Sequence, residues 1–186
     1  MEKKTLVVNL IAPPSAGKST MAANIFAELK WMGIDCELVS EFAKELVWEQ
    51  RNETFKDELY IFAKQNHRLF RVNGKVDVII TDRPIILSVF YNNKYGDKSS
   101  EFQELVLHEH NKYENLNFYI NRKKPYNPNG RNQTEEESNQ FGVEILEMLD
   151  ELTDIDGFPY TTISGDLEGV KFVVGEIIKK ILLKNN

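Results

Sequence analysis

Cysteine and long apolar runs are both scarce in this sequence of 186 residues. Cys36 is the one cysteine, which excludes a disulfide within the chain and a zinc site built from several cysteines. The most apolar stretches, residues 6–12 and 76–80, are far shorter than the about 20 residues of a membrane-spanning helix. No segment has the apolar region and cleavage site of a signal peptide. We therefore expect a cytoplasmic protein without a membrane segment.

An excess of positive charge is also lacking. The chain has 23 lysines and arginines against 29 aspartates and glutamates, a formal net charge of −6. Contact with nucleic acid would therefore need a local basic patch, because the overall charge opposes it. The length, with 41% hydrophobic and 28% charged residues, is typical of one globular domain, with or without an inserted lid. No repeat or linker marks a boundary, so we expect residues 1–186 to form one domain.

Short apolar segments alternate with segments of helical spacing. The apolar segments predict five buried strands, at 5–11, 36–39, 76–81, 116–120 and 160–164. The helical spacing predicts helices at 19–32, 41–51, 54–71, 84–91, 100–113, 134–152 and 167–184. Thr54 is expected to cap the third of these helices. Strands that are apolar throughout and separated by helices are typical of a parallel sheet covered on both faces. The predicted fold class is therefore α/β, with three layers around a five-stranded parallel sheet.

The most specific motif lies between the first strand and the first helix. It reads Ala12-Pro13-Pro14-Ser15-Ala16-Gly17-Lys18-Ser19-Thr20. The motif follows the phosphate-loop pattern G-x-x-x-x-G-K-[ST], except that Ala12 stands at the first glycine. Such a loop turns backbone N–H groups toward phosphate oxygens at a helix N-terminus. We expect residues 13–20 to bind ATP, Lys18 to reach the β- and γ-phosphates, and the Ser19 hydroxyl to ligate Mg²⁺.

Acidic residues follow the next two strands in chain order. Asp82 comes directly after the third strand, where a carboxylate can hold Mg²⁺ directly or through water. Its neighbour Arg83 suits an acceptor phosphate or the phosphoryl group in transfer, although a surface ion pair is the alternative. Glu41 follows the second strand and could take the proton of an acceptor hydroxyl, or favour the helix dipole, or do both. Either Glu41 or Asp82 could be the base.

These motifs together resemble a known family. The ordered set is residues 13–20, 41–45, Gln65, 82–83 and 126–131. It resembles the small P-loop kinases of the ribosylnicotinamide-kinase-like AAA group, which includes phage and bacterial "AAA family ATPase" proteins. It is similar, more loosely, to deoxynucleoside and thymidylate kinases. The resemblance covers nearly the whole chain and implies a P-loop NTPase fold that uses ATP and Mg²⁺, in the host cytoplasm if a phage encodes the protein.

The resemblance also implies roles for single residues. Glu41 matches the carboxylate that acts as base in such kinases, and Asp82 with Arg83 matches an acid–arginine pair. Gln65 matches a glutamine that reads a base edge with its amide, while an exposed polar residue on a helix is the alternative. Pro84 departs from the pattern, because a serine is frequent at that position in nucleoside kinases.

A basic loop follows the fourth strand. Arg122, Lys123, Lys124 and Arg131 lie within 13 residues of an acidic chain. The segment resembles a kinase lid, over about 121–140, in which Arg122 and Arg131 would neutralise charge on the phosphoryl group in transfer. Tyr126 could stack on a base or ring of the substrate. A solvated basic loop and a contact with a polynucleotide backbone are the alternatives.

The sequence thus predicts a kinase that transfers the γ-phosphoryl group of ATP to a nucleoside- or nucleotide-like acceptor, with no membrane partner. The expected catalytic residues are Lys18, Glu41, Asp82, Arg83, Arg122 and Arg131. The expected substrate-binding residues are Glu41, Gln65, Arg83 and Tyr126, and the expected Mg²⁺ ligands are Ser19 and Asp82. One alternative is a kinase for hydroxymethylated bases in phage DNA. Another is a regulatory P-loop ATPase. The chain is expected to be a monomer or a homodimer.

Overall fold

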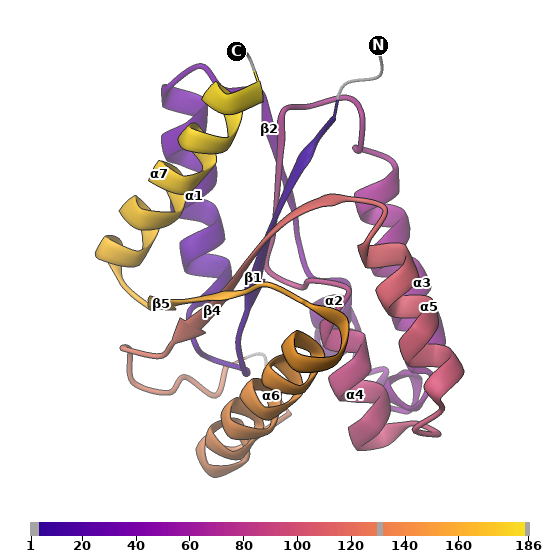
Figure 1. The fold of residues 1–186 in the computed structure, drawn as a ribbon. Helices are drawn as coiled ribbons and strands as arrows, with labels where there is room; N and C mark the ends of the chain where they lie inside the picture. The colour runs from indigo at the N-terminus through magenta and orange to yellow at the C-terminus, as the bar shows by residue number, and fades with distance from the viewer. Residues whose placement is uncertain (1–3, 130–131, 185–186) are drawn as a thin grey trace.

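Five parallel strands form one sheet at the centre of the computed structural model, which describes residues 4–129 and 132–184 (Figure 1). The strands are β1 (Leu6–Ile11), β2 (Cys36–Val39), β3 (Val78–Thr81), β4 (Glu114–Asn121) and β5 (Thr161–Ser164). Their spatial order is β2-β3-β1-β4-β5, and each neighbouring pair is parallel. The predicted three-layer α/β fold with a five-stranded parallel sheet is confirmed.

Helices cover both faces of the sheet (Figure 1). They are α1 (Lys18–Trp31), α2 (Ala43–Trp48), α3 (Glu58–Phe70), α4 (Leu87–Tyr95), α5 (Ser100–His110), α6 (Glu135–Asp156) and α7 (Leu167–Lys184), with a 3₁₀ helix η1 (Asn52–Lys56). No helix over the described residues is long and apolar enough to cross a membrane.

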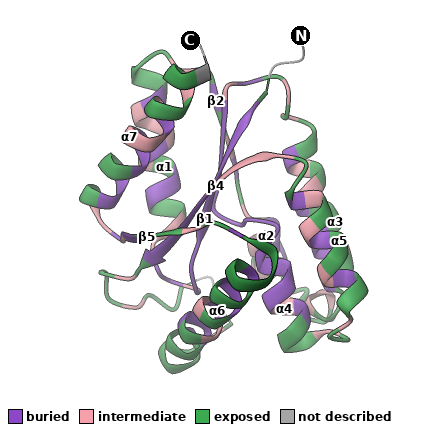
Figure 2. Cartoon of the chain, viewed as in Figure 1, coloured by how far each residue is buried: buried purple, intermediate pink, exposed green. Residues whose placement is uncertain are grey.

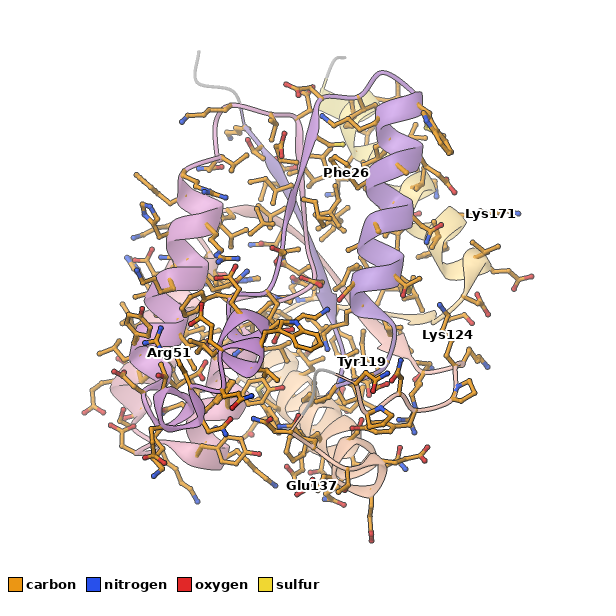
Figure 3. The ribbon with its side chains drawn as sticks, turned by 180° about the vertical axis from the view of Figure 1, so that it is seen from behind. Phe26, Arg51, Tyr119, Lys124, Glu137 and Lys171 are labelled. Carbon is orange, nitrogen blue, oxygen red and sulfur yellow. The ribbon has the colours of Figure 1, made fainter. Side chains whose placement is uncertain are left out.

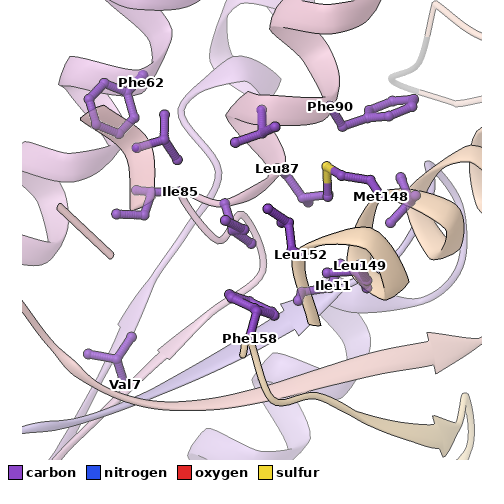
Figure 4. Close-up of a cluster of buried hydrophobic side chains, with 14 of the residues drawn as sticks. Val7, Ile11, Phe62, Ile85, Leu87, Phe90, Met148, Leu149, Leu152 and Phe158 are labelled. Atoms are coloured by element: carbon purple, nitrogen blue, oxygen red, sulfur yellow. The ribbon is translucent and has the colours of Figure 1, made fainter. Parts of the chain in front are cut away.

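The two cores follow from the alternation of side chains along buried strands. In β1, Leu6, Val8 and Leu10 pack with residues of α1 and α7, whereas Val7 and Ile11 pack with residues of α3 to α6. Figure 4 shows the second of these clusters, and Figure 2 shows that the central strands are buried while the outer faces of the helices are exposed. β1 and β3 are buried along their whole length, which explains why they are almost entirely apolar. The expectation of strands that are apolar throughout is wrong for β2, β4 and β5, which have exposed or half-buried positions.

Two helix starts illustrate how local sequence sets the elements. Thr134 and Glu137 form a reciprocal capping box at the start of α6, a feature that was not predicted from the sequence. The predicted cap at Thr54 is wrong, because residues 52–56 form the 3₁₀ helix and α3 begins only afterwards. Asp57 caps α3 instead, since its side chain accepts a hydrogen bond of 3.0 Å from the backbone N–H of Tyr60.

The sheet order determines which loops meet. β1 lies between β3 and β4, and β3 lies between β1 and β2. Because all strands run the same way, the segments that follow β1, β2 and β3 leave the same edge of the sheet beside one another. The two chain ends lie at the opposite end of the molecule (Figure 1). The phosphate-loop motif, Glu41 and the Asp82–Arg83 pair therefore converge, as predicted.

Candidate functional site

The loop after β1 has the backbone that its sequence predicts. Gly17 has φ +97° and caps the N-terminus of α1. A Cβ at Gly17 would meet nothing within 4 Å, so the backbone conformation rather than space favours glycine there. The Lys18 Nζ donates hydrogen bonds of 2.8 and 2.9 Å to the carbonyls of Ala12 and Pro13. Ala12 is buried and is not among the residues with positive φ, which explains why alanine can replace the usual glycine.

The outer side of this loop is held by the segment before α6 and by α6 itself. The Ser15 hydroxyl accepts a hydrogen bond of 2.8 Å from the backbone N–H of Asn127 and lies 3.2 Å from its carbonyl. The Ser138 hydroxyl of α6 donates to the carbonyl of Pro14 at 2.6 Å. These contacts fix the loop from outside, so that its inner side faces the cavity described next.

A cavity of about 560 Å³ extends from the phosphate loop. Six residues of the loop and of the start of α1 line one end: Pro14, Ser15, Gly17, Lys18, Ser19 and Thr20. The other walls come from four regions of the fold: α2 with η1 (Ala43, Lys44, Val47, Asn52, Phe55, Lys56), α3 (Glu58, Ile61), α4 (Tyr91, Tyr95), and the start of α6 with the segment before it (Asn132, Gln133, Glu137). Glu41 and Arg83 complete the lining. Figure 3 labels Glu137 in the first turn of α6 and Arg51 just after α2. One continuous space thus joins a phosphate loop to a second pocket.

Arg83 is the most buried charged group of that second pocket, together with Glu58. Both side chains are 4% exposed, and the Arg83 Nη2 donates to the Glu58 Oε1 at 3.1 Å. The Arg83 guanidinium carbon lies 4.5 Å from the centre of the Tyr91 ring, a cation–π contact. The Arg83 Nε lies 3.8 Å from the Glu41 Oε1, too far for a hydrogen bond. Within the described residues, Arg83 Nε and Nη1 have no hydrogen-bond partner.

The carboxyl groups of the pocket differ in their surroundings. Burial raises the pKa of Glu58 above its usual range, and the opposing attraction of Arg83 is the smaller effect. Glu41 is less buried, with 26% of its side chain exposed. Asp82 is buried, and its Oδ1 accepts a hydrogen bond of 2.9 Å from the backbone N–H of Glu41. Asp82 therefore links the end of β3 to the end of β2.

The two predicted Mg²⁺ ligands come from these converging loops. Ser19 is exposed on the cavity wall at the start of α1, and Asp82 follows β3, the strand next to β1. Over the described residues, no group of three or more His, Cys, Asp or Glu side chains could hold a metal ion. Mg²⁺ in phosphate-transfer sites takes one or two protein oxygens, and phosphates and water supply the rest. A hydroxyl and a carboxylate at one edge of the sheet fit that donor set.

Gln65 does not lie where the resemblance implies. It is 1% exposed, so the alternative of an exposed helical residue is also wrong. Its Oε1 accepts from the backbone N–H of Phe42 at 2.9 Å, and its Nε2 donates to the carbonyl of Ser40 at 3.4 Å. Gln65 is absent from the described cavity wall. The Gln65 amide thus forms hydrogen bonds with the backbone of the residues before and after Glu41, and it thereby positions Glu41.

Arg122 and Tyr126 likewise lie away from the described cavity wall. The Arg122 Nη2 donates to Glu135 at 3.3 Å and to Asn139, and its guanidinium lies over the Tyr126 ring at 5.8 Å. The Tyr126 hydroxyl donates to the backbone of Gln133. Here both pack against the start of α6 rather than facing a substrate. Arg131, the other predicted lid arginine, lies outside the described residues.

The predicted lid contributes to the cavity through other residues. Asn132, Gln133 and Glu137 line it, and the Asn132 Nδ2 donates to the Asn52 Oδ1 of η1 at 3.3 Å. From Glu135 onward, the predicted lid is the start of α6. Its earlier residues include Lys124, labelled in Figure 3. In the described parts of this segment, Asn127 contacts the phosphate loop and Asn132 contacts η1 on the opposite wall.

Glu58 and the aromatic residues of the pocket were not predicted from the sequence. A signal for Glu58 is present, because it lies on the buried face of α3 with Ile61, Phe62, Gln65 and Leu69. A glutamate on an otherwise apolar helix face requires a partner, and that requirement points to a buried cation. Tyr91, Tyr95 and Phe55 give no comparable signal, since aromatic residues at helical spacing are usual in a core.

Taken together, a left-handed glycine before Lys18, a helix start and a carboxylate after the neighbouring strand define a P-loop NTPase. A family model described as an AAA domain matches residues 7–169, and the chain belongs to that family. No curated protein sequence matches the chain. Among solved structures, an APS kinase of Mycobacterium tuberculosis with one cysteine replaced by alanine is similar at 14% identity, with a TM-score of 0.43. That match covers 77% of this chain and 99% of the kinase chain.

Proposed function

We propose that this chain is an ATP- and Mg²⁺-dependent phosphotransferase. It transfers the γ-phosphoryl group of ATP to a hydroxyl or phosphate of a nucleoside- or nucleotide-like acceptor. The observation that carries the proposal is the continuity of the cavity from Lys18 to Glu41 and Arg83. ATP hydrolysis requires space only for the nucleotide and a water molecule. This cavity continues beyond that space into a pocket with aromatic walls at Phe55, Tyr91 and Tyr95, which offers room for an acceptor.

The nucleotide end has the groups that hold a triphosphate. Backbone N–H groups of the loop and the start of α1 bind phosphate oxygens, and Lys18 adds a positive charge beside them. Ser19 and Asp82 would hold Mg²⁺, which neutralises charge on the phosphates when it is bound. Asn127 and Ser138 hold the loop in place from outside, and Lys18 exchanges its bonds to the loop carbonyls for the phosphates.

The chemical step uses Glu41 as base. An acceptor hydroxyl between Glu41 and the γ-phosphate gives its proton to the Glu41 carboxylate as its oxygen bonds to phosphorus. The bond from that phosphorus to the β–γ bridging oxygen breaks, and ADP leaves with the electron pair. The same hydroxyl oxygen can accept a hydrogen bond from the Arg83 Nε, which lies 3.8 Å from Glu41 and has no other partner in the described structure. Asp82 acts as a positioning residue for Glu41 rather than as the base.

A transfer assay with γ-labelled ATP and Mg²⁺ tests this proposal. The acceptors are nucleosides, nucleoside monophosphates, nicotinamide riboside and DNA that contains hydroxymethylated bases. We expect label on one acceptor class, and its loss in Lys18→Ala, while the matched variant Lys30→Ala on the outer part of α1 keeps it. Label that is found only as free phosphate, at a rate that no acceptor changes, would show a regulatory ATPase instead.

A further inference from the structure

The buried charges of the acceptor pocket are unequal in number. Arg83 is one cation, and the two carboxyl groups Glu58 and Glu41 face it at 3.1 and 3.8 Å. The other cations of that wall are more accessible: Lys44 is half-buried, and Lys56 is exposed and paired with Glu53 at 2.6 Å. The deepest part of the pocket therefore has no excess of positive charge.

The pocket offers both hydrogen-bond donors and hydrogen-bond acceptors. Arg83 offers two N–H groups without a partner in the described structure, while Glu41 and Glu58 offer carboxyl oxygens. A hydroxyl group can accept from the arginine and donate to a carboxylate at once. A phosphate dianion can only accept, and here it would lie beside two carboxyl groups that repel it. The pocket therefore fits a hydroxyl better than a phosphate.

Glu58 sets this preference. It lies in the first turn of α3, accepts from Arg83 and is hydrogen-bonded to Ser88 of α4. Without its charge, Arg83 would face Glu41 alone and the pocket would gain one unit of positive charge. Its burial is costly, since desolvation outweighs the attraction of Arg83 in raising its pKa. A carboxyl group whose burial on a cavity wall costs desolvation energy is a candidate for a functional role.

We propose that Glu58 is a specificity-determining residue, which makes the pocket select an uncharged, hydroxyl-bearing ring compound of the nucleoside type over its phosphorylated form. The planar part of such a compound fits the walls at Phe55, Tyr91 and Tyr95. α3 contacts both η1 and α4, the elements that carry these aromatic residues. The inference rests on the proposed function, because it assigns this pocket to the acceptor.

Calorimetric binding tests the proposal without a need for turnover. The protein is loaded with Mg²⁺ and a non-hydrolysable ATP analogue and titrated with five ribo- and deoxyribonucleosides, nicotinamide riboside, and the 5′-monophosphate of each. We expect at least one nucleoside to bind about tenfold or more tightly than its monophosphate, a difference of roughly 1.4 kcal/mol or more, because the phosphate would lie beside two carboxyl groups that repel it. In Glu58→Gln that ratio should fall about tenfold, mainly because the monophosphate binds more tightly. Glu104→Gln, in an exposed residue of α5 that is absent from the described cavity wall, should leave the ratio unchanged.

Three results would overturn the proposal. The first is that the wild-type chain binds every monophosphate as tightly as its nucleoside or more tightly. The second is that it binds no nucleoside. The third is that Glu58→Gln loses the same affinity for a nucleoside and for its monophosphate, as expected for a purely structural role. The wild-type comparison decides the matter by itself if the variant does not fold.

The transfer assay separates the two proposals. Transfer of label to monophosphate acceptors, giving labelled diphosphates, with none to nucleosides would contradict this inference and leave the phosphotransferase standing. Nucleoside binding without any transfer would contradict the phosphotransferase.

Discussion

The carboxylate of Asp82 accepts a hydrogen bond from the backbone N–H of Glu41, with 2.9 Å between Oδ1 and N. This bond joins the segments that follow β3 and β2, 41 residues apart in the chain. The two carboxylates, which the sequence could not distinguish, differ in their surroundings. Asp82 is buried, while Glu41 lies on the cavity wall. We therefore propose Glu41 as the base and Asp82 as the residue that positions it.

Glu41→Gln should abolish most transfer without weakening ATP binding. The amide keeps the size of the side chain but cannot take a proton, so kcat should fall about 10²–10⁴-fold. Equilibrium binding of a fluorescent ATP analogue checks that the nucleotide end is intact. The matched variant Glu45→Gln changes an exposed residue of α2 that is paired with Arg68, and it should retain kcat. A wild-type kcat in Glu41→Gln would show that another group is the base.

Asp82→Asn and Ser19→Ala should each raise the Mg²⁺ concentration required for half-maximal activity. Ser19→Ala removes the hydroxyl oxygen, and Asp82→Asn replaces the charged carboxylate by a neutral amide, which attracts the ion less. A titration of activity with Mg²⁺ measures the change. Asp154→Asn, an exposed change late in α6, serves as the control. An unchanged Mg²⁺ requirement in both variants would refute the assignment of these ligands.

Gln65→Ala should destabilise the fold and impair catalysis through Glu41. The change leaves the buried backbone N–H of Phe42 without its partner, while the carbonyl of Ser40 keeps its hydrogen bond from Arg68. The expected loss in the free energy of unfolding is about 1–3 kcal/mol, measured by urea denaturation. Lys64→Ala, on the exposed side of the same helix, should lose far less. If Gln65 instead reads a base, Gln65→Ala would alter the preference among nucleosides and leave stability unchanged.

His110 should make stability depend on pH. Burial lowers the pKa of His110 from 6.5 to about 4, so the unfolded chain binds the proton more readily than the folded chain. The stabilisation is complete above pH 6.5 and is lost as pH falls toward 4, by an amount on the order of 3 kcal/mol. The ring lies 5.1 Å from that of Phe158, so His110→Phe should pack there and remove this part of the pH dependence. Urea denaturation at pH 7 and pH 4.5 measures it, and an unchanged difference between the two pH values would contradict the assignment.

Features with a local physical cause were predictable from the sequence. The phosphate loop between a strand and a helix, the strand that leads into it and the start of a helix at about residue 134 each depend on a few adjacent residues. Asp82 and Glu41 could be placed at one edge of the sheet, because parallel strands bring their carboxyl ends together.

Features that depend on packing between distant segments were not predictable. Gln65 binds the backbone 23 residues earlier, and Glu58 pairs with an arginine 25 residues later. Arg122 fulfils the pattern of a lid residue, yet Glu135 and Asn139 of α6 bind it. Charge and spacing alone could not show which of several partners each of these side chains would find.

The stoichiometry of the reaction tests the central claim most directly. ADP formation and labelled acceptor should be followed together from γ-labelled ATP, with and without the acceptor that the panel identifies. The phosphotransferase predicts one ADP for each labelled acceptor, little ADP without acceptor, and neither product in Lys18→Ala. ADP that forms at the same rate with and without acceptor, with all label in free phosphate, would contradict it.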